Sequence, residues 1–374
     1  MNLAKNLCKY FRRRFRVKER KGEKMYMINQ QRIQILKKKI DCFNRVKLAN
    51  LPTPLMELPN FSNALGGPRI YMKRDDLTGG VSFGGNKTRM LEFRLAPAVA
   101  QKADTIVSGF GIQSNHARQI VVASRKLGMD VRLILRKTRQ NEKINVQGNL
   151  LIDLLAGAHI KIVNATPEEQ AILIHNETNR LRAEGKNPYE TGIHDVDLSA
   201  VAYVACSLEL LKQIIKFSIE PTHLYVASEG ATQAGLMLFS KYTETSYSIV
   251  GINMVDWIPD VKARISSIAN VAAIRLGIDC HVTPEDVVND TNYIGPAYAV
   301  PTPECIRAIK LLAETEGILA DPVYVGKGLA GLIDHIETGK LGKRDTVIYL
   351  HTGGTPALFC YPDMFNFTDL LEME

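Results

Sequence analysis

Short apolar runs alternate with longer amphipathic stretches along most of the chain. Seven runs of four or five residues are typical of buried strands, and they lie at residues 70–73, 105–108, 131–135, 160–163, 224–227, 248–252 and 346–350. Helical spacing of apolar residues predicts helices at residues 28–43, 89–101, 115–127, 146–155, 167–184, 199–217, 231–242, 261–276, 303–316 and 328–337. Strands that alternate with helices in this way favour parallel sheets covered by helices.

The length of 374 residues fits two domains, at about 150 residues per domain. No linker rich in proline or glycine separates two halves of the chain. The sequence therefore predicts an α/β fold of two interleaved domains, each a largely parallel twisted sheet flanked by helices. Ligands of such folds bind beyond the carboxyl ends of the strands, so we expect the active site in the cleft between the domains.

Basic residues are concentrated in residues 1–24, which hold ten Lys or Arg and two acids and so carry the whole formal charge of +8. The rest of the chain is formally neutral, which argues against a nucleic-acid-binding face on the folded body. Three interpretations of the basic head are open. It is a disordered extension or a start codon assigned too early, since Met25 and Met27 follow. It is an organellar targeting peptide, rich in arginine and poor in acids although it lacks serine, or it is a polyanion-binding arm.

Two further patterns bear on location. No apolar segment of a secretory signal follows the basic head, and no run of about 20 apolar residues occurs, so we expect no membrane span. The six cysteines are scattered, without a Cys-x-x-Cys pair or a neighbouring histidine cluster. This spacing predicts neither a metal site nor a disulfide framework, and free thiols fit a reducing compartment such as the cytoplasm.

Lys87 is the first candidate for chemistry. It ends the sequence Gly-Gly-Asn-Lys at residues 84–87 and precedes the helix predicted at 89–101. Glycines let the backbone approach a ligand closely. A lysine near the positive end of a helix dipole has a lowered pKa, which favours the neutral amine that imine formation needs. The same tetrapeptide also suits a solvated loop, so both interpretations stay open for the motif alone.

Two other segments follow a predicted strand and open a helix. In residues 108–116, Ser114 and the amides beside it could hold a carboxylate, or Ser114 could be an ordinary capping residue. In residues 226–235, small residues form a turn where a phosphate would bind, although Glu229 has the wrong charge for that role. This turn is neither a Walker loop nor a Gly-x-Gly-x-x-Gly sequence.

Seven short motifs carry a resemblance to one known family over about residues 45–362. They are Pro-Thr-Pro-Leu at 52–55, Lys-Arg-Asp-Asp at 73–76, Gly-Gly-Asn-Lys-Thr-Arg at 84–89, Gln-Ser-Asn-His at 113–116, Thr-Gln-Ala-Gly-Leu at 232–236, Asp-Pro-Val-Tyr-x-Gly-Lys at 321–327 and His-Thr-Gly-Gly at 351–354. The chain resembles the D-cysteine desulfhydrase and 1-aminocyclopropane-1-carboxylate (ACC) deaminase family of fold type II pyridoxal-phosphate enzymes, and the L-cysteate sulfo-lyase branch most. One such motif is common by chance, but seven in order are not.

The resemblance implies an overall organisation. The fold would be tryptophan synthase β-like, with residues 28–83 and 198–374 as a large cofactor domain and residues 84–197 as a small domain. Residues 1–27 would form the basic head. Family members of this kind are expected to be homodimers that act on a small amino acid with pyridoxal 5′-phosphate.

The resemblance also implies roles for single residues. Catalytic roles would belong to Lys87, Ser114, Tyr298 and Tyr324. Cofactor contacts would come from Lys87, Asn86, Asn115, Ser228, Gly230, Ala231, Thr232 and Thr352, and substrate contacts from Ser114, Asn115 and His116. Lys87 would form the Schiff base with the cofactor and then move the α-proton of the substrate, while the tyrosines would hold or protonate it. The protein would supply orientation and electrostatics, and the cofactor the carbanion chemistry.

Four departures from the family pattern surround the expected cofactor site. They are Met90 in place of a lysine, the acid-bearing phosphate loop at 228–232, Val325 after the active-site tyrosine, and the loop at 191–195. Losing a phosphate-binding cation or adding a carboxylate would each cost on the order of 1–3 kcal/mol without compensation. Arg89 and Lys327 are the candidates for such compensation.

The leading functional hypothesis is therefore a lyase that eliminates the β-substituent of D-cysteine, L-cysteate or a close relative. His116 and Val325 favour this branch over ACC deaminase, which stays an alternative within the family. The departures at Met90 and Glu229 motivate an alternative from another class, a non-catalytic relative that binds an amino acid or a partner in the cleft.

Overall fold

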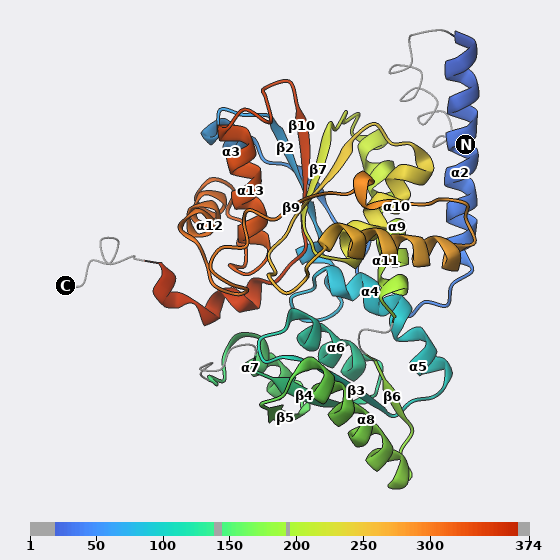
Figure 1. The fold of residues 1–374 in the computed structure, drawn as a ribbon, viewed down its shortest axis with the longest axis vertical. Coiled ribbons are helices and arrows are strands. Elements are labelled where there is room, and N and C mark those ends of the chain that lie inside the picture. The colour runs from blue at the N-terminus through green and yellow to red at the C-terminus, as the bar shows by residue number, and fades with distance from the viewer. Residues whose placement is uncertain (1–18, 138–143, 192–194, 366–374) are drawn as a thin grey trace, which may run out of the picture.

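Two parallel sheets organise the computed structural model, which describes residues 19–137, 144–191 and 195–365. They lie in two bodies, one above the other in Figure 1. The larger sheet has the strand order β1-β2-β10-β7-β8-β9 and is parallel except for β1, and the smaller has the order β5-β4-β3-β6 and is entirely parallel. The strands are β1 (Leu55–Glu57), β2 (Arg69–Arg74), β3 (Thr105–Gly111), β4 (Asp130–Arg136), β5 (His159–Val163), β6 (Pro188–Glu190), β7 (His223–Ala227), β8 (Ser248–Ile252), β9 (Val288–Asp290) and β10 (Thr346–His351).

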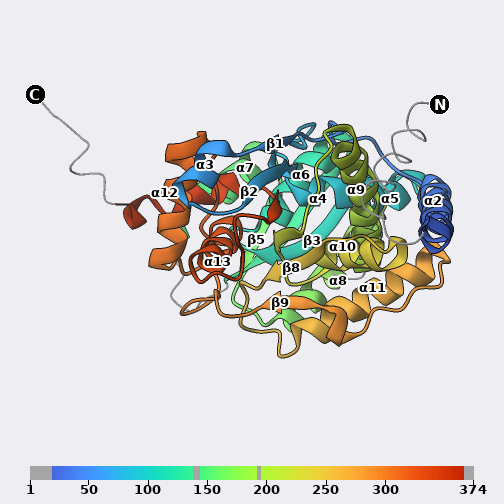
Figure 2. The same ribbon diagram turned by 90° about the horizontal axis from the view of Figure 1, so that it is seen from above.

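Helices cover both sheets, as Figures 1 and 2 show. They are α2 (Glu19–Asp41), α3 (Pro59–Ala64), α4 (Asn86–Arg94), α5 (Ala96–Ala100), α6 (Asn115–Lys126), α7 (Gly148–Leu155), α8 (Pro167–Ala183), α9 (Val196–Lys216), α10 (Ala231–Thr243), α11 (Val261–Leu276), α12 (Pro303–Glu316) and α13 (Val325–Glu337). Parallel neighbours need crossover connections, and helices supply them between most successive strands of each sheet.

The alternation of side chains along β10 explains how the larger sheet is buried on both faces. Val347 and Tyr349 pack into a core with α12 and α13, whereas Ile348 and Leu350 pack into a second core with α9, α10 and α11. All four side chains are at most 2% exposed. A strand with a period of two and apolar residues at every position must lie between two apolar layers, which is why residues 346–350 form a continuous apolar run.

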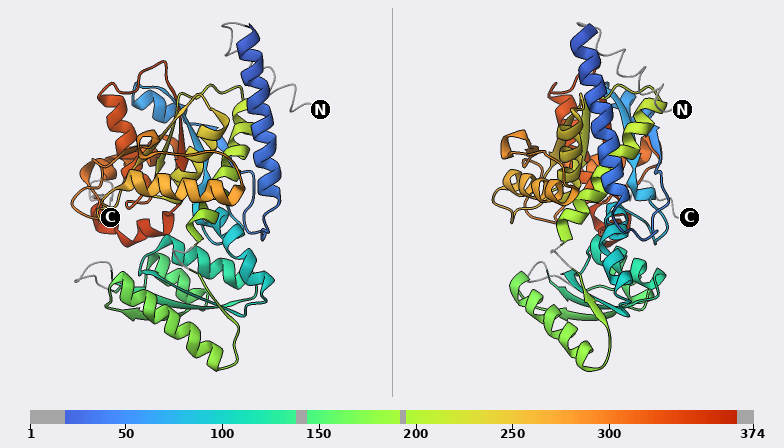
Figure 3. Two further views of the ribbon diagram at one scale, coloured as in Figure 1. Left: turned by 45° about the vertical axis from the view of Figure 1, so that its right-hand side comes forward. Right: turned by 90° about the vertical axis from the view of Figure 1, so that its right-hand side faces the viewer.

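The two sheets are interleaved along the chain. Strands β3 to β6 follow one another in the smaller sheet, while the larger sheet takes β1 and β2 from before them and β7 to β10 from after them. The chain therefore crosses from one body to the other twice, first through α4 and then through α9, and Figure 3 shows the two bodies from two further sides. The predicted α/β fold with two interleaved parallel sheets is confirmed, whereas the division at residues 83 and 197 stays a prediction.

Several element boundaries differ from the prediction. The helix predicted at 89–101 is two helices, α4 and α5, and it begins at Asn86, so that Lys87 lies inside its first turn. Pro97 at the start of α5 lacks the amide that a continuous helix would use. Residues 19–27, which the sequence assigned to the basic head, form the first part of α2. The strands β1, β6 and β9 have three residues each, too short to give a periodic signal.

Helix α9 is long and apolar enough to cross a membrane by length and composition, but 78% of its apolar window is buried within the protein. It packs against α4, α10 and α11 at the centre of the larger body. It is a core helix and does not indicate a membrane protein.

Candidate active site

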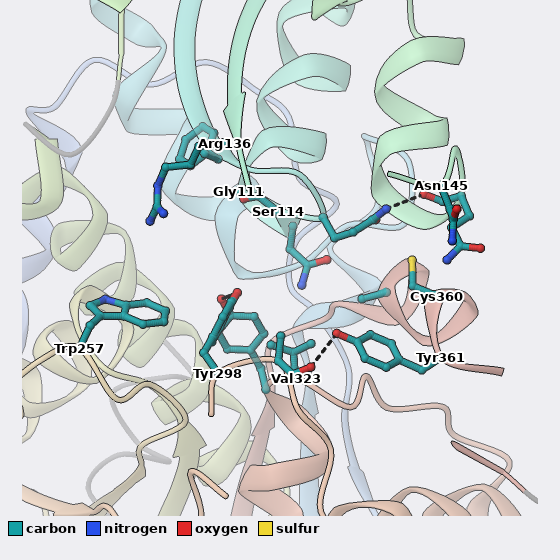
Figure 4. Close-up of a pocket in the computed structure, with 16 residues that line it drawn as sticks. Gly111, Ser114, Arg136, Asn145, Trp257, Tyr298, Val323, Cys360 and Tyr361 are labelled. Atoms are coloured by element: carbon teal, nitrogen blue, oxygen red, sulfur yellow. Dashed lines mark hydrogen bonds between the residues drawn. The ribbon is translucent and has the colours of Figure 1, made fainter. Parts of the chain in front are cut away.

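Two adjoining cavities lie in the cleft between the sheets and share Ser114, Asn115 and Tyr324. The smaller, of about 80 Å³, contains Lys87 in its wall. The larger, of about 490 Å³, opens beside it and is drawn in Figure 4. Its walls come from β3, β4 and the loops around Trp257, Tyr298 and Tyr361. The carboxyl ends of parallel strands meet here, as expected for a ligand site.

A tight glycine turn presents Lys87 to the smaller cavity. Gly85 has φ +124°, and a Cβ at this position would lie 2.7 Å from Nε2 of Gln119, so only glycine fits. The next residue, Asn86, donates its backbone N–H to the carbonyl of Thr352 at 2.9 Å and opens α4. Burial lowers the pKa of the Lys87 amine, the Arg94 guanidinium lowers it further, and the Glu229 carboxylate opposes both effects.

The loop between β7 and α10 forms the opposite wall. Ser228 Oγ accepts the backbone N–H of Gly230 at 3.3 Å and of Gln233 at 3.2 Å, which fixes the turn that opens α10. Asn86 Nδ2 donates to Thr232 Oγ1 at 3.1 Å and ties this turn to the start of α4. The N-terminal amides of a helix face this wall, which is the arrangement that binds a phosphate.

The start of α6 supplies the third wall. Ser114 caps this helix by accepting the backbone N–H groups of His116 and Ala117 at 3.1 and 3.2 Å. Asn115 Oδ1 accepts a hydrogen bond from Asn149 Nδ2 at 2.9 Å. The capping and binding interpretations of Ser114 are therefore compatible, because the capped residue also lines both cavities.

Tyr324 forms the fourth wall of the smaller cavity, and a buried carboxylate holds its backbone in place. Asp321 is 0% exposed and accepts the backbone N–H groups of Val323, Tyr324 and Val325 at 2.8–2.9 Å. This cap sets the direction in which Tyr324 enters the cleft at the start of α13. The hydroxyls of Tyr324 and Tyr298 lie 2.7 Å apart, and burial raises the pKa of both phenols, so both are neutral at physiological pH.

The structure brings the predicted site residues together from distant parts of the chain. Those that line the smaller cavity are Asn86, Lys87, Ser114, Asn115, His116, Ser228, Gly230, Ala231, Thr232, Tyr324 and Thr352. Tyr298 lines the larger cavity and reaches the group through Tyr324. The sequence reasoning missed Arg136, Trp257 and Tyr361 in the larger cavity, because they lie outside every motif and only the fold carries them there.

The departures around the cofactor site have distinct outcomes. Met90 and Val325 are 2% and 0% exposed and pack into the two cores of the larger body, so neither faces the cavity. Glu229 does line the smaller cavity. The fourth departure, at 191–195, lies partly outside the described residues; Thr191 is buried and receives a hydrogen bond from Ser108 Oγ at its carbonyl.

The two cations expected to compensate for Met90 are engaged elsewhere. Arg89 forms a buried ion-pair network with Asp75 and Glu209 at 2.8 Å. Lys327 donates to the carbonyls of Ile294 and Ala297 at 2.5 and 3.2 Å. A different cation approaches the phosphate loop.

That cation is Arg264 of α11. Its Nε lies 3.8 Å from the point where a Cβ on Gly230 would stand. Arg264 is exposed, so its charge is screened by water, but it is the residue type that pairs best with phosphate oxygens.

Comparisons with known proteins agree with this geometry. Residues 46–353 match the model of the family described as "Pyridoxal-phosphate dependent enzyme". The chain belongs to this family. Over 330 residues, it is 37% identical to a D-cysteine desulfhydrase of Serratia proteamaculans (strain 568), covering 87% of this chain and 98% of that protein. It is 35% identical over 324 residues to a D-cysteine desulfhydrase of Salmonella paratyphi C (strain RKS4594), covering 85% and 96%.

Two solved structures share the fold of this chain. A crystal structure of an ACC deaminase homologue has 31% identity and a TM-score of 0.79, covering 90% of this chain and 99% of that one. Apo diaminopropionate ammonia lyase of Escherichia coli has 16% identity and a TM-score of 0.57, with 88% of each chain covered, and so shares the fold alone.

The residues of this pyridoxal-phosphate dependent enzyme fit its cofactor. Lys87 offers an amine with a lowered pKa, and the amides at the start of α10 lie in the wall of the same cavity. Asn86 and Thr352 line that cavity between them. This donor set suits an aldehyde that carries a phosphate, and Glu229 is the one member of the phosphate loop whose charge opposes it.

Proposed function

We propose that the protein is a lyase that eliminates the β-substituent of D-cysteine or a closely related small amino acid, releasing pyruvate, ammonia and the sulfur leaving group. The observation that carries the proposal is the position of Lys87. Its amine shares one small cavity with the phosphate-type helix N-terminus of α10 and the Ser114–His116 start of α6. The D-cysteine desulfhydrase relatives support the substrate class.

Pyridoxal phosphate, when bound, supplies the electron sink that stabilises negative charge at the substrate Cα. The residues of the chain position and move protons around that atom. Lys87, whose pKa is lowered by burial, accepts the α-proton. Ser114 and Asn115, at the positive end of α6, bind the substrate carboxylate. Tyr324, held by Asp321, stays protonated and donates a hydrogen bond to the departing β-substituent.

Glu229 bears on the choice of substrate. It lines the same cavity as Lys87 and Tyr324. A sulfonate in this cavity would place a second negative charge near this carboxylate, whereas a thiol would not. The cavity therefore favours D-cysteine over L-cysteate, and ACC stays the family alternative.

The experiment measures 2-oxo acid and ammonia from the purified, cofactor-loaded protein. D-Cysteine, L-cysteate, β-chloro-D-alanine and ACC are supplied in turn. We expect pyruvate and sulfide from D-cysteine, loss of this activity in Lys87→Ala, and no loss in Lys186→Ala, which changes an exposed lysine. Bound cofactor without a 2-oxo acid from any of the four compounds would overturn the proposal and favour the non-catalytic alternative.

We also propose that the enzyme works as a homodimer in the cytoplasm. Leu155 on α7 and Phe359 on the 3-10 helix η4 (Thr355–Cys360), which contacts α7, are 78% and 61% exposed, and large apolar side chains exposed in this way are ones that an interface would cover. The cysteines among the described residues are free thiols, as expected in a reducing compartment. Light scattering of the purified protein tests the dimer: a monomer mass at micromolar concentration would contradict it.

A further inference from the structure

A buried arginine contacts the histidine of the substrate-binding wall. Arg94 ends α4, two helical turns beyond Lys87, and is only 2% exposed. Its Nη1 lies 3.0 Å from Nε2 of His116, and its Nη2 donates to Thr191 Oγ1 at 3.3 Å. No motif of the sequence marks this arginine, and in the site described above it acts only through its charge on Lys87.

The chemistry of the guanidinium fixes the proton of the imidazole. A guanidinium carries five N–H donors and no acceptor, so the nitrogen that faces it must accept. Nε2 of His116 is therefore unprotonated, and the neutral ring carries its hydrogen on Nδ1. An imidazolium would turn an N–H toward another N–H and place two positive charges together.

The surroundings of His116 reinforce this state. Burial holds the pKa of His116 well below its usual range, and the Arg94 guanidinium and the Lys87 amine lower this pKa further. The ring of Phe110 packs beside the imidazole with centroids 4.6 Å apart. Among the described residues, none is hydrogen-bonded to Nδ1, and His116 lines the cavity that contains Lys87 and Ser114.

We propose that Arg94 is a positioning residue that locks His116 as a neutral, Nδ1-protonated imidazole, whose Nδ1–H is donated to the carboxylate of the amino-acid substrate. The identity of the acceptor rests on the proposed function, whereas the tautomer does not. The Arg94 guanidinium, on the Nε2 side of the ring, polarises the Nδ1–H bond. The buried positive charge of Arg94 thereby strengthens the hydrogen bond that the neutral ring donates to the carboxylate. A neutral His116 places no second cation on the Lys87 side of the cavity. An imidazolium there would disfavour the protonated form of Lys87 further, but it would also compete for the substrate carboxylate.

The direct test is the nitrogen spectrum of histidine in the cofactor-loaded protein labelled with ¹⁵N-histidine, recorded from pH 5.5 to 8.5. The His116 signals are assigned as those missing from the spectrum of His116→Asn. We expect one protonated nitrogen, Nδ1, and one unprotonated nitrogen, Nε2, over the whole range. A protonated Nε2 in the wild type, as the other tautomer or as imidazolium, would overturn the proposal.

Variants at position 94 test whether the arginine causes this state. Arg94→Met keeps much of the apolar length, and we expect it to give a mixture of the two neutral tautomers. Arg94→Lys keeps a donor-only cation and should retain the single Nδ1–H tautomer. The exposed His281 serves as an internal reference whose signals should not differ between variants. An unchanged His116 spectrum in Arg94→Met overturns the role of Arg94. If Arg94→Met does not fold, the Arg94→Lys spectrum decides in its place, because a mixture of tautomers there contradicts the lock.

A matched pair at position 116 tests the donor. The amide nitrogen of asparagine can replace Nδ1, whereas that of glutamine reaches the position of Nε2. We expect His116→Asn to raise KM for D-cysteine by less than threefold, and His116→Gln and Arg94→Met to raise it about tenfold with a smaller change in kcat. Equal KM values for the two His116 variants would refute donation through Nδ1. If no substrate is turned over, the proposed function fails, and the nitrogen spectrum still decides the tautomer.

Discussion

The hydroxyl oxygens of Tyr298 and Tyr324 lie 2.7 Å apart, so one phenol donates a hydrogen bond to the other. Burial keeps both phenols neutral, which leaves one hydroxyl proton of the pair free to point toward a ligand. Tyr324 lines both cavities and Tyr298 only the larger. Under the proposed function we therefore expect Tyr324 to be the member of the pair that reaches the leaving group, with Tyr298 orienting it.

This division predicts unequal effects of removing each hydroxyl. Tyr324→Phe should lower kcat for D-cysteine by about 10²-fold, because the departing β-substituent loses a preorganised hydrogen-bond donor. Tyr298→Phe should lower kcat by about tenfold, because the Tyr324 hydroxyl loses one hydrogen-bond partner. The double variant should lose no more than Tyr324→Phe alone, since the two groups act as one unit. Steady-state kinetics check this, and fully additive losses would contradict it.

The charge of Glu229 near Lys87 leads to a prediction of how the attachment of the cofactor to the Lys87 amine depends on pH. Attachment needs the neutral amine, so its rate should rise as the pH increases through the pKa of Lys87. Glu229 raises that pKa against the effect of burial. Replacing it by glutamine removes the opposing charge, so the pKa falls and the midpoint of attachment moves to lower pH.

The measurement is the rate at which cofactor-free protein develops the visible absorbance of bound cofactor, followed across pH. Glu229→Gln should also bind the cofactor several-fold more tightly, because a carboxylate leaves the phosphate loop. Glu184→Gln, which changes an exposed acid, serves as the control. A midpoint in Glu229→Gln that is unchanged or shifted to higher pH would contradict the assigned position of Glu229.

The sequence predicted most of the fold because burial on both sides leaves a strong local signal. The apolar runs that became β7, β8 and β10 are continuous, since each lies between two helical layers. The three-residue strands β1, β6 and β9 left no comparable pattern. The start of α4 was predicted three residues late, because Asn86 and Lys87 are polar and face the cleft rather than a core.

The site was predicted where motifs marked it and missed where only the fold assembles it. Lys87, Ser114 and Tyr324 each sit in a recognisable motif and meet in one cavity. Arg94 and Arg264 have no such motif, because their relation to His116 and Gly230 depends on how α4 and α11 pack. Sequence likewise suggested Arg89 and Lys327 as phosphate partners, without showing that nearer acceptors already engage them.

The approach of Arg264 to the phosphate loop predicts a contribution to cofactor affinity. Arg264→Ala should raise the dissociation constant of pyridoxal phosphate by about three- to tenfold, a modest effect because this side chain is exposed and screened. The loss should shrink at high salt. Lys262→Ala is the matched control, since it removes an exposed cation from the same helix. Equal effects of the two variants would show that general charge, rather than contact with the loop, is responsible.

A buried acid outside the cavities predicts how stability depends on pH. Asp153 on α7 is 0% exposed, and its carboxylate oxygens have no hydrogen-bond partner among the residues that the structure describes. Burial raises its pKa to about 8, although Arg118 opposes this. The folded state thus holds a proton that the unfolded state releases near pH 4. Stability from this group is present at low pH and is lost as the pH rises from about 4 to about 8.

Asp153→Asn removes this dependence, because an amide does not titrate. The difference in free energy of unfolding, variant minus wild type, should rise by up to roughly 1.4 kcal/mol per pH unit across that window and level off above it. Urea unfolding of both proteins at several pH values measures the difference, and the contributions of all other groups cancel in it. A difference that is constant between pH 5 and 8 would show that Asp153 ionises as an ordinary exposed carboxyl does. That result would contradict the raised pKa expected for a carboxyl that is buried on α7.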